Sequence, residues 1–231
     1  MTQIKVLAFD TGGTVLDWHA GLTAAMAAWG TKHGIERDWH TLANEHRHRS
    51  LRRMTGTVDP GFNIDDVHRE VLCEVFDETG VGGSAEDRRA IAERWHQLDA
   101  WPDFAAALRR LRQHRICVSF TILSLSLIVD VSRRNSIDWD AVIACEMLGV
   151  YKPRPDAYRR AAALLAVEPR EILMVACHNF DLDAARDVGY HTAFVRRPDE
   201  WGPAGPPDPV PNPATDIVVE GFAELADRLG A

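Results

Sequence analysis

The chain has 231 residues and a mass of 25.8 kDa, which suits one large domain or a core that carries a smaller insertion. Its net charge of −8 and its pI near 5.7 argue against binding to nucleic acid or to an anionic membrane, and favour a small-molecule partner. The chain lacks an apolar run long enough for a membrane span and a basic amino-terminal segment leading into a long apolar stretch, so we expect a cytoplasmic protein.

Residues 4–9 form the first expected element, a short strand with the sequence IKVLAF. The run is almost continuously apolar, as a strand covered on both faces should be, and it leads directly into Asp10. Gly12 and Gly13 follow, and glycine lets the backbone turn sharply or approach a ligand closely. A carboxylate at this point is either a turn residue or a reacting group, and the stretch by itself leaves both interpretations open.

Residues 17–100 have amphipathic helical periodicity and no convincing strand pattern. Four helices are predicted, over residues 20–34, 39–54, 64–80 and 84–101, and two of them end on glycine. We interpret the segment as a helical cap inserted directly after the first strand, where it would lie over Asp10.

Strands and helices alternate through the rest of the chain. Strands are expected at residues 115–123, 140–147, 171–177 and 217–219, with helices after each of them and an irregular, Pro- and Gly-rich surface loop at 196–216. This order predicts an α/β fold: a Rossmann-like parallel sheet core formed by residues 1–16 and 101–231, with the helical cap domain at 17–100. In such sheets, ligands bind beyond the carboxyl ends of the strands.

The four cysteines are far apart in sequence, and three of them lie in or beside apolar runs. They form no CxxC pair, so we expect reduced thiols rather than disulfides. They are Cys73, Cys117, Cys145 and Cys177.

Four motifs occur in order along the chain. They are FDTGGTVLD at 9–17, Thr121 at the end of the second strand, YKPRPDAY at 151–158, and VACHNFDLDAARDVGYHTAFVRRP at 175–198. With the helical insertion, they resemble the haloacid dehalogenase superfamily, and more narrowly its type II 2-haloacid dehalogenase branch.

The resemblance implies that Asp10 is a nucleophile that forms a covalent ester. Lys152 matches the motif lysine of the superfamily and would keep Asp10 ionised, while Thr14 would support Asp10 and Thr121 would donate a hydrogen bond to the substrate or to Asp10. Asp181 is the candidate for orienting Lys152 or for positioning the attacking water.

Binding of the substrate is assigned to further polar residues. An arginine from the cap is expected to hold the halide or the carboxylate, and by position Arg47 is the best match in the run NEHRHRSLRRM, where a solvated basic helix face is the alternative. His178 and Asn179 are expected to line the pocket and to bind the substrate carboxylate or water.

Two positions favour haloacid chemistry over phosphoryl transfer. Superfamily phosphatases usually carry a second acid two residues after the nucleophile, where this chain has Gly12, and a magnesium-binding aspartate where it has Cys177. Mg²⁺ prefers oxygen ligands, and a halide leaves without needing a proton, so neither a metal nor another cofactor is expected. The predicted reaction is displacement of halide from a short 2-haloacid by Asp10, followed by hydrolysis of the ester to a 2-hydroxy acid.

Departures from the type II pattern leave the substrate open. Gly12 stands where the family often has a bulky aromatic residue, Ile122 where it has Asn, and Ala176 where it commonly has Ser. A magnesium-dependent phosphatase and a non-catalytic relative that binds a small carboxylate or a protein are the alternatives. Related cap domains often pair, so the resemblance also suggests a homodimer.

Overall fold

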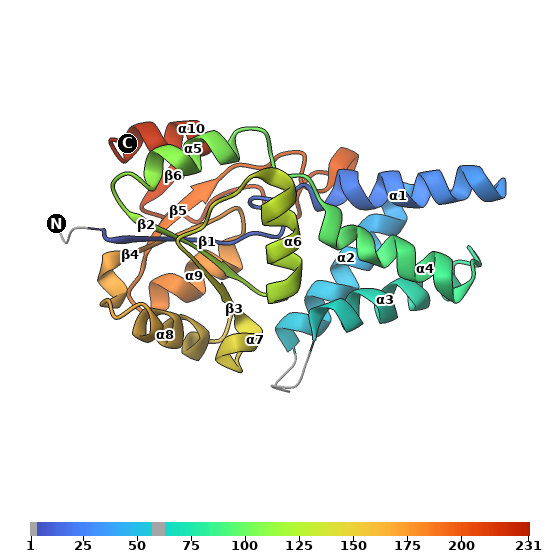
Figure 1. Cartoon of the computed structure of the whole chain (residues 1–231), viewed down its shortest axis with the longest axis horizontal. Coiled ribbons are helices and arrows are strands. Elements are labelled where there is room, and N and C mark those ends of the chain that lie inside the picture. Colours follow the sequence, from blue (N-terminus) through green and yellow to red (C-terminus); the bar gives the residue numbers. More distant parts are fainter. Residues whose placement is uncertain (1–3, 57–62) are drawn as a thin grey trace.

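The computed structural model describes residues 4–56 and 63–231, which form one six-stranded sheet and the helices around it (Figure 1). Neighbouring strands are parallel throughout, in the order β3-β2-β1-β4-β5-β6. The predicted Rossmann-like parallel sheet is therefore confirmed. The strands are β1 (Val6–Phe9), β2 (Ile116–Thr121), β3 (Ala141–Ala144), β4 (Ile172–Ala176), β5 (His191–Val195) and β6 (Ile217–Val219).

Helices cover both faces of the sheet, which explains why its central strands are apolar throughout. In Figure 1, α5 (Phe104–Leu111) and α10 (Phe222–Arg228) lie above the sheet, and α8 (Pro155–Leu164) and α9 (Asn179–Asp187) lie below it. The ring of Phe9 in β1 packs 5.6 Å from that of Phe104 and 5.9 Å from that of Phe222. The two remaining helices of this part are α6 (Leu125–Asn135) and the short α7 (Cys145–Leu148).

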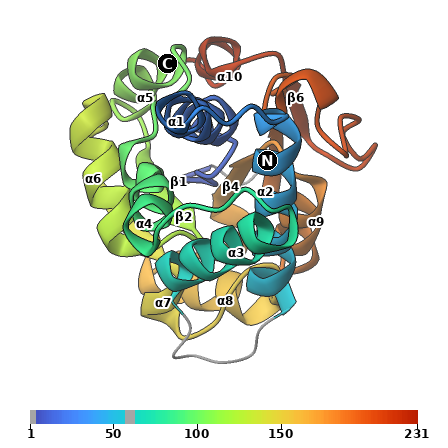
Figure 2. The same cartoon turned by 90° about the vertical axis from the view of Figure 1, so that its right-hand side faces the viewer.

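Four helices between β1 and α5 gather on one side, beyond the carboxyl end of β1 (Figures 1 and 2). The first, α1, ends as predicted at Gly34, which adopts the left-handed conformation at φ 68°. The last is shorter than expected, because it continues as a 3₁₀ turn over Glu93–Gln97. The four are α1 (Trp18–His33), α2 (Trp39–Gly56), α3 (Ile64–Glu78) and α4 (Ala85–Ala92).

Three local predictions were wrong. The strand β5, with the sequence HTAFV, was missed because it is short and begins with two polar residues. The strand predicted at 140–147 ends at Ala144, since the next four residues form α7, which closes at Gly149 in the left-handed conformation. The loop at 196–216 is not confined to the surface, because Glu200 and Trp201 within it are buried.

The cysteine prediction is confirmed. All four thiols are free, and Cys117, Cys145 and Cys177 are buried. Within the described ranges, no helix combines the length and the apolar character needed to cross a membrane.

Candidate active site

The carboxyl ends of three neighbouring strands bring the predicted residues together. Asp10 directly follows β1, Thr121 is the last residue of β2, and Cys177 directly follows β4. The backbone N–H of Asp10 donates to the carbonyl of Val175 in β4 at 2.9 Å, which fixes the turn. The strand order reverses between β1 and β4, and such a switch point is where parallel sheets bind their ligands.

Lys152 joins two buried aspartates. Its Nζ lies 2.7 Å from Oδ2 of Asp181 and 3.4 Å from Oδ1 of Asp10, over the ring of Phe120. Tyr158 donates its hydroxyl to Oδ1 of Asp181 at 2.5 Å. Both oxygens of Asp181 are therefore engaged, which favours a role in orienting Lys152 over the alternative role of positioning water.

The two oxygens of Asp10 have different surroundings. Thr14 donates its hydroxyl to Oδ2 at 2.7 Å, and Nδ1 of His178 lies 3.2 Å from the same oxygen. Among the described residues, the one polar side chain in contact with Oδ1 is Lys152, at 3.4 Å. Burial by itself raises the pKa of Asp10, but Lys152 and His178 outweigh it and hold that pKa well below its usual range. Asp10 is thus an ionised carboxylate with one less saturated oxygen, as a nucleophile requires.

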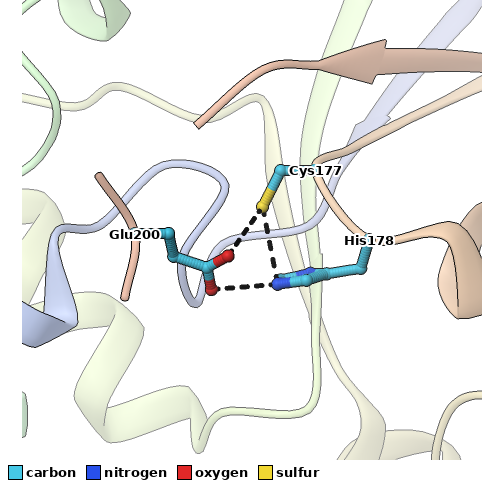
Figure 3. Close-up of side chains that lie close together, drawn as sticks. All are labelled: Cys177, His178 and Glu200. Atoms are coloured by element: carbon cyan, nitrogen blue, oxygen red, sulfur yellow. Dashed lines mark hydrogen bonds and ion pairs between the residues drawn. The ribbon is translucent and has the colours of Figure 1, made fainter. Parts of the chain in front are cut away.

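His178 lies between two carboxylates. Its Nδ1 faces Asp10, and its Nε2 lies 3.0 Å from Oε1 of Glu200 and 3.4 Å from Sγ of Cys177, as Figure 3 shows for the last two. Burial disfavours the imidazolium, but the carboxylates of Glu200 and Asp10 outweigh it and hold the pKa of His178 well above its ordinary value. Burial raises the pKa of Cys177 to about 11, so its neutral thiol contributes a contact and not a charge. In the resting site His178 is therefore a cation that links two anions.

Glu200 is a residue of the candidate site that the sequence analysis missed. It is 1% exposed, and Trp18 donates its indole N–H to Oε1 at 3.1 Å. Gly13, at φ 95°, makes room for it, because a Cβ there would lie 2.0 Å from Oε1. The Pro- and Gly-rich stretch that contains Glu200 was assigned to a surface loop, so Glu200 was not considered. The available signal was Gly13, because a glycine directly after the nucleophile turn indicates that another group packs against it. Burial raises the pKa of Glu200, but His178 outweighs this and lowers it.

Arg47 reaches the site from α2. Its guanidinium is 1% exposed, lies 5.6 Å from the ring of Trp18 and 5.3 Å from that of Trp95, and donates from Nη2 to the carbonyl of Gly12 at 3.3 Å. Nε and Nη1 have no partner within the described part of the protein. Unpaired N–H groups on a buried cation are costly, so they indicate a place for an anion.

Thr121 and Asn179 are tied to other parts of the structure. Thr11 donates its hydroxyl to Oγ1 of Thr121 at 2.5 Å, and in the described part of the chain no hydrogen bond joins Thr121 to Asp10. Asn179 donates to Asp208 at 2.7 Å and to the carbonyl of Val210 at 2.8 Å, which anchors the loop after β5. Gly12 lies against Arg47, whose Nη2 would be 3.3 Å from a Cβ at that position.

A cavity of about 320 Å³ opens beside His178 and Glu200. Much of its wall comes from α2, which contributes Leu51 and Arg52 among others, and from the loop after β5, whose lining residues include Trp201 and two prolines. The residues that line it are His48, Leu51, Arg52, Thr55, Pro153, Cys177, His178, Asn179, Phe180, Glu200, Trp201, Pro206, Pro207 and Asp208.

One group of side chains in the described part of the chain has the composition of a metal site. Cys177, His178 and Glu200 each offer a ligand atom, and these atoms lie within 4.8 Å of one another. A thiol and an imidazole do not suit Mg²⁺, which agrees with the expectation that this position is not a magnesium site.

Comparisons with known proteins agree with this arrangement. A family model described as haloacid dehalogenase-like hydrolase matches residues 4–189. The (S)-2-haloacid dehalogenase 4A of Burkholderia cepacia is 30% identical over 215 residues, which cover 84% of each chain. An (S)-2-haloacid dehalogenase of Xanthobacter autotrophicus is 27% identical over 84% of this chain and 76% of that protein. The crystal structure of a defluorinating L-2-haloacid dehalogenase, 33% identical, superimposes with a TM-score of 0.90 over 99% of this chain and 96% of that chain.

Proposed function

This chain belongs to the haloacid dehalogenase-like hydrolases, and from that premise we propose that it hydrolyses short 2-haloacids to 2-hydroxy acids without a metal. The observation that carries the proposal is that the same site holds both the ionised carboxylate of Asp10 and Arg47, a buried cation with two nitrogens, Nε and Nη1, that have no partner among the described residues. The first is suited to attack carbon, and the second to hold an anion.

Asp10 performs the first step. Its Oδ1, which only Lys152 contacts at 3.4 Å, attacks C2 of the substrate, while Oδ2 stays bound to Thr14. The C2–halogen bond breaks, the halide leaves with the bonding electrons, and an ester links Asp10 to the acid. Lys152 serves by keeping Asp10 ionised, and Asp181 serves by holding Lys152.

Arg47 binds an anion in the proposed reaction. Its Nε and Nη1 donate hydrogen bonds to either the departing halide or the substrate carboxylate, and Trp18 and Trp95 keep its planar group fixed. Gly12 permits this approach, and an acid at that position would compete for the guanidinium. The halide needs no proton, so the missing second acid costs the reaction nothing.

His178 serves the second step. Esterification neutralises Asp10 and removes one of the two carboxylates that stabilise the imidazolium, so the pKa of His178 falls when a base is needed. Once the imidazolium has released its Nδ1 proton to solvent, His178 accepts a proton from water as that water attacks the ester carbon, and Glu200 holds its Nε2 at 3.0 Å. The bond between the ester carbon and the ester oxygen breaks, His178 returns the proton to that oxygen, and the 2-hydroxy acid leaves. Asp10 gives its remaining proton to solvent and is restored as a carboxylate.

We further propose that residues 17–100 act as the cap and residues 1–16 and 101–231 as the core. Arg47 supports this division, because it extends from α2 to the backbone beside Asp10. Substrate would therefore bind between the two parts, with the cavity beside His178 as its entrance.

Halide release from a panel of 2-chloro, 2-bromo and fluoro acids, measured in EDTA, tests the proposal. Release by the wild-type chain, and its loss in a folded Asp10→Asn variant, are the expected results. A single turnover in ¹⁸O-labelled water should also place label in Asp10. No halide release in EDTA, together with magnesium-dependent phosphate release, would favour the phosphatase alternative. No release of either halide or phosphate would favour a non-catalytic relative.

A further inference from the structure

We propose that Cys177, His178 and Glu200 form a binding site for a Zn²⁺-class cation, and that an ion bound there switches the hydrolase off. The proposed cation binding does not depend on the proposed function, whereas the proposed inhibition does. Two of the side chains follow β4 and the third comes from the turn after β5, so only the folded sheet brings them together (Figure 3).

The separations between the ligand groups of the three side chains are close to those in a tetrahedral zinc site. Sγ of Cys177 lies 3.4 Å from Nε2 of His178 and 3.5 Å from Oε2 of Glu200, and Nε2 lies 3.0 Å from Oε1 of Glu200. Zinc bound at about 2.3 Å to sulfur and about 2.0–2.1 Å to nitrogen and oxygen holds its ligands roughly 3.2–3.6 Å apart. The separations of 3.0, 3.4 and 3.5 Å lie within or just below this range, and the Glu200 carboxylate, which uses a different oxygen for each of its two contacts, must turn to present one oxygen to the ion.

The second set of contacts also suits a metal. Nδ1 of His178 faces Oδ2 of Asp10 at 3.2 Å, which directs Nε2 toward the site in the carboxylate–histidine–metal arrangement that metalloproteins use. Oε1 of Glu200 is held by Trp18, so Oε2, whose one contact is with the thiol, is the oxygen available to the ion.

Access and charge permit binding. All three side chains line the cavity of about 320 Å³, which gives a route for the ion and leaves a fourth position for water. The incoming dication replaces the thiol proton of Cys177 and the Nε2 proton of His178, both released to solvent, so the net charge of the site does not change. Thiolate and imidazole ligands select Zn²⁺ or Co²⁺ over Mg²⁺.

Occupancy would block the second step of the reaction. The ion takes the electron pair of Nε2 of His178, and Nδ1 then keeps its proton toward Asp10. His178 therefore cannot accept a proton from the water that attacks the ester.

Titration with Co²⁺ tests the site without relying on activity, because a thiolate ligand gives a charge-transfer absorption band that nitrogen and oxygen ligands do not. We expect one Co²⁺ per chain with this band, and displacement of the band by Zn²⁺. Cys177→Ser should abolish the band, and Glu200→Gln should weaken Zn²⁺ binding, measured calorimetrically, at least tenfold.

Two control variants separate this site from adventitious binding. Cys73→Ser removes the most exposed thiol, and His40→Gln removes one member of the stacked pair formed by His19 and His40. Both should bind Co²⁺ and Zn²⁺ as the wild type does. Circular dichroism of each variant establishes that it is folded, and if Cys177→Ser does not fold, Glu200→Gln and His178→Gln carry the test.

The outcomes distinguish this inference from the proposed function. Absence of the thiolate band, or unchanged binding in Glu200→Gln, would overturn the site even if halide is released in EDTA. Binding with no halide release under any condition would leave the site and remove the proposed function. Where halide is released, added Zn²⁺ should stop it and EDTA should restore it, and undiminished release at saturating Zn²⁺ would overturn the inhibition.

Discussion

Replacing Lys152 with methionine should destabilise the protein in a pH-dependent manner. Nζ of Lys152 lies 2.7 Å from Asp181 and 3.4 Å from Asp10, and all three residues are buried. Removing one partner of a buried ion pair costs about 3–5 kcal/mol, because the remaining charge is left uncompensated. That is a large part of the roughly 5–15 kcal/mol by which domains are stable, so the variant should fold but unfold easily.

The pH dependence identifies the electrostatic part of this loss. In the wild type the folded-state pKa of Asp10 lies below its unfolded value, so its contribution to stability is present above the unfolded pKa and is lost as the pH falls. Without Lys152, burial and the mutual repulsion of the two carboxylates raise the pKa of Asp10, and they raise further the pKa of Asp181, which burial already holds above its ordinary value in the wild type. The resulting penalty is complete at neutral pH and diminishes as the pH falls toward the unfolded pKa.

Urea unfolding followed by circular dichroism at about pH 7.5 and about pH 4.5 measures this difference. The loss of unfolding free energy in Lys152→Met should be smaller at the lower pH. Lys5→Met is the matched control, since the exposed ion pair of Lys5 with Glu171, at 2.6 Å, should contribute less than about 1 kcal/mol at either pH. An equal loss at both pH values, or a comparable loss in the control, would refute the electrostatic account.

Three further substitutions test the site. Arg47→Lys keeps the charge but loses the planar group, and should lower kcat/KM for halide release about 100-fold without unfolding the protein. Gly13→Ala should lower the unfolding free energy by at least about 1 kcal/mol more than Gly34→Ala, whose cost of about 1–2 kcal/mol comes from the backbone alone, because only the first new Cβ meets Glu200. His178→Gln should release halide once and then stop, and mass spectrometry should find the substrate acid esterified to Asp10; unmodified Asp10 after that burst would contradict the role of His178 in hydrolysis.

Residues that follow an apolar strand could be predicted from the sequence. Asp10 and Thr121 lie at the carboxyl ends of β1 and β2, as expected, because a short continuous apolar run locates a strand, although the run at 115–123 extends two residues beyond β2. Lys152 and Asp181 were named as site residues with the help of the resemblance. In the structure, Nζ of Lys152 lies 2.7 Å from Oδ2 of Asp181 and 3.4 Å from Oδ1 of Asp10. Their roles in the reaction stay predictions.

Other features had no local signal. β5 is short and begins with polar residues, and its absence from the predicted elements concealed the turn that carries Glu200. The loop after it was predicted from its prolines and glycines to lie at the surface, yet Glu200 and Trp201 are buried in it. Composition describes how a segment bends, but not what the rest of the chain places over it.

The sequence by itself determined the parallel α/β core, the helical segment after the first strand, and the strand ends at which reactive groups gather. These depend on periodicity and on turn residues, which act over a few neighbouring positions. Only the tertiary structure decided that Glu200 meets His178, that Gly13 makes room for it, and that Arg47 donates to the carbonyl of Gly12 while its Nε and Nη1 have no partner among the described residues. These contacts join residues 22 to 187 positions apart (His178 to Glu200, and Gly13 to Glu200), and the order of strands in the sheet and the packing of α2 against it set them.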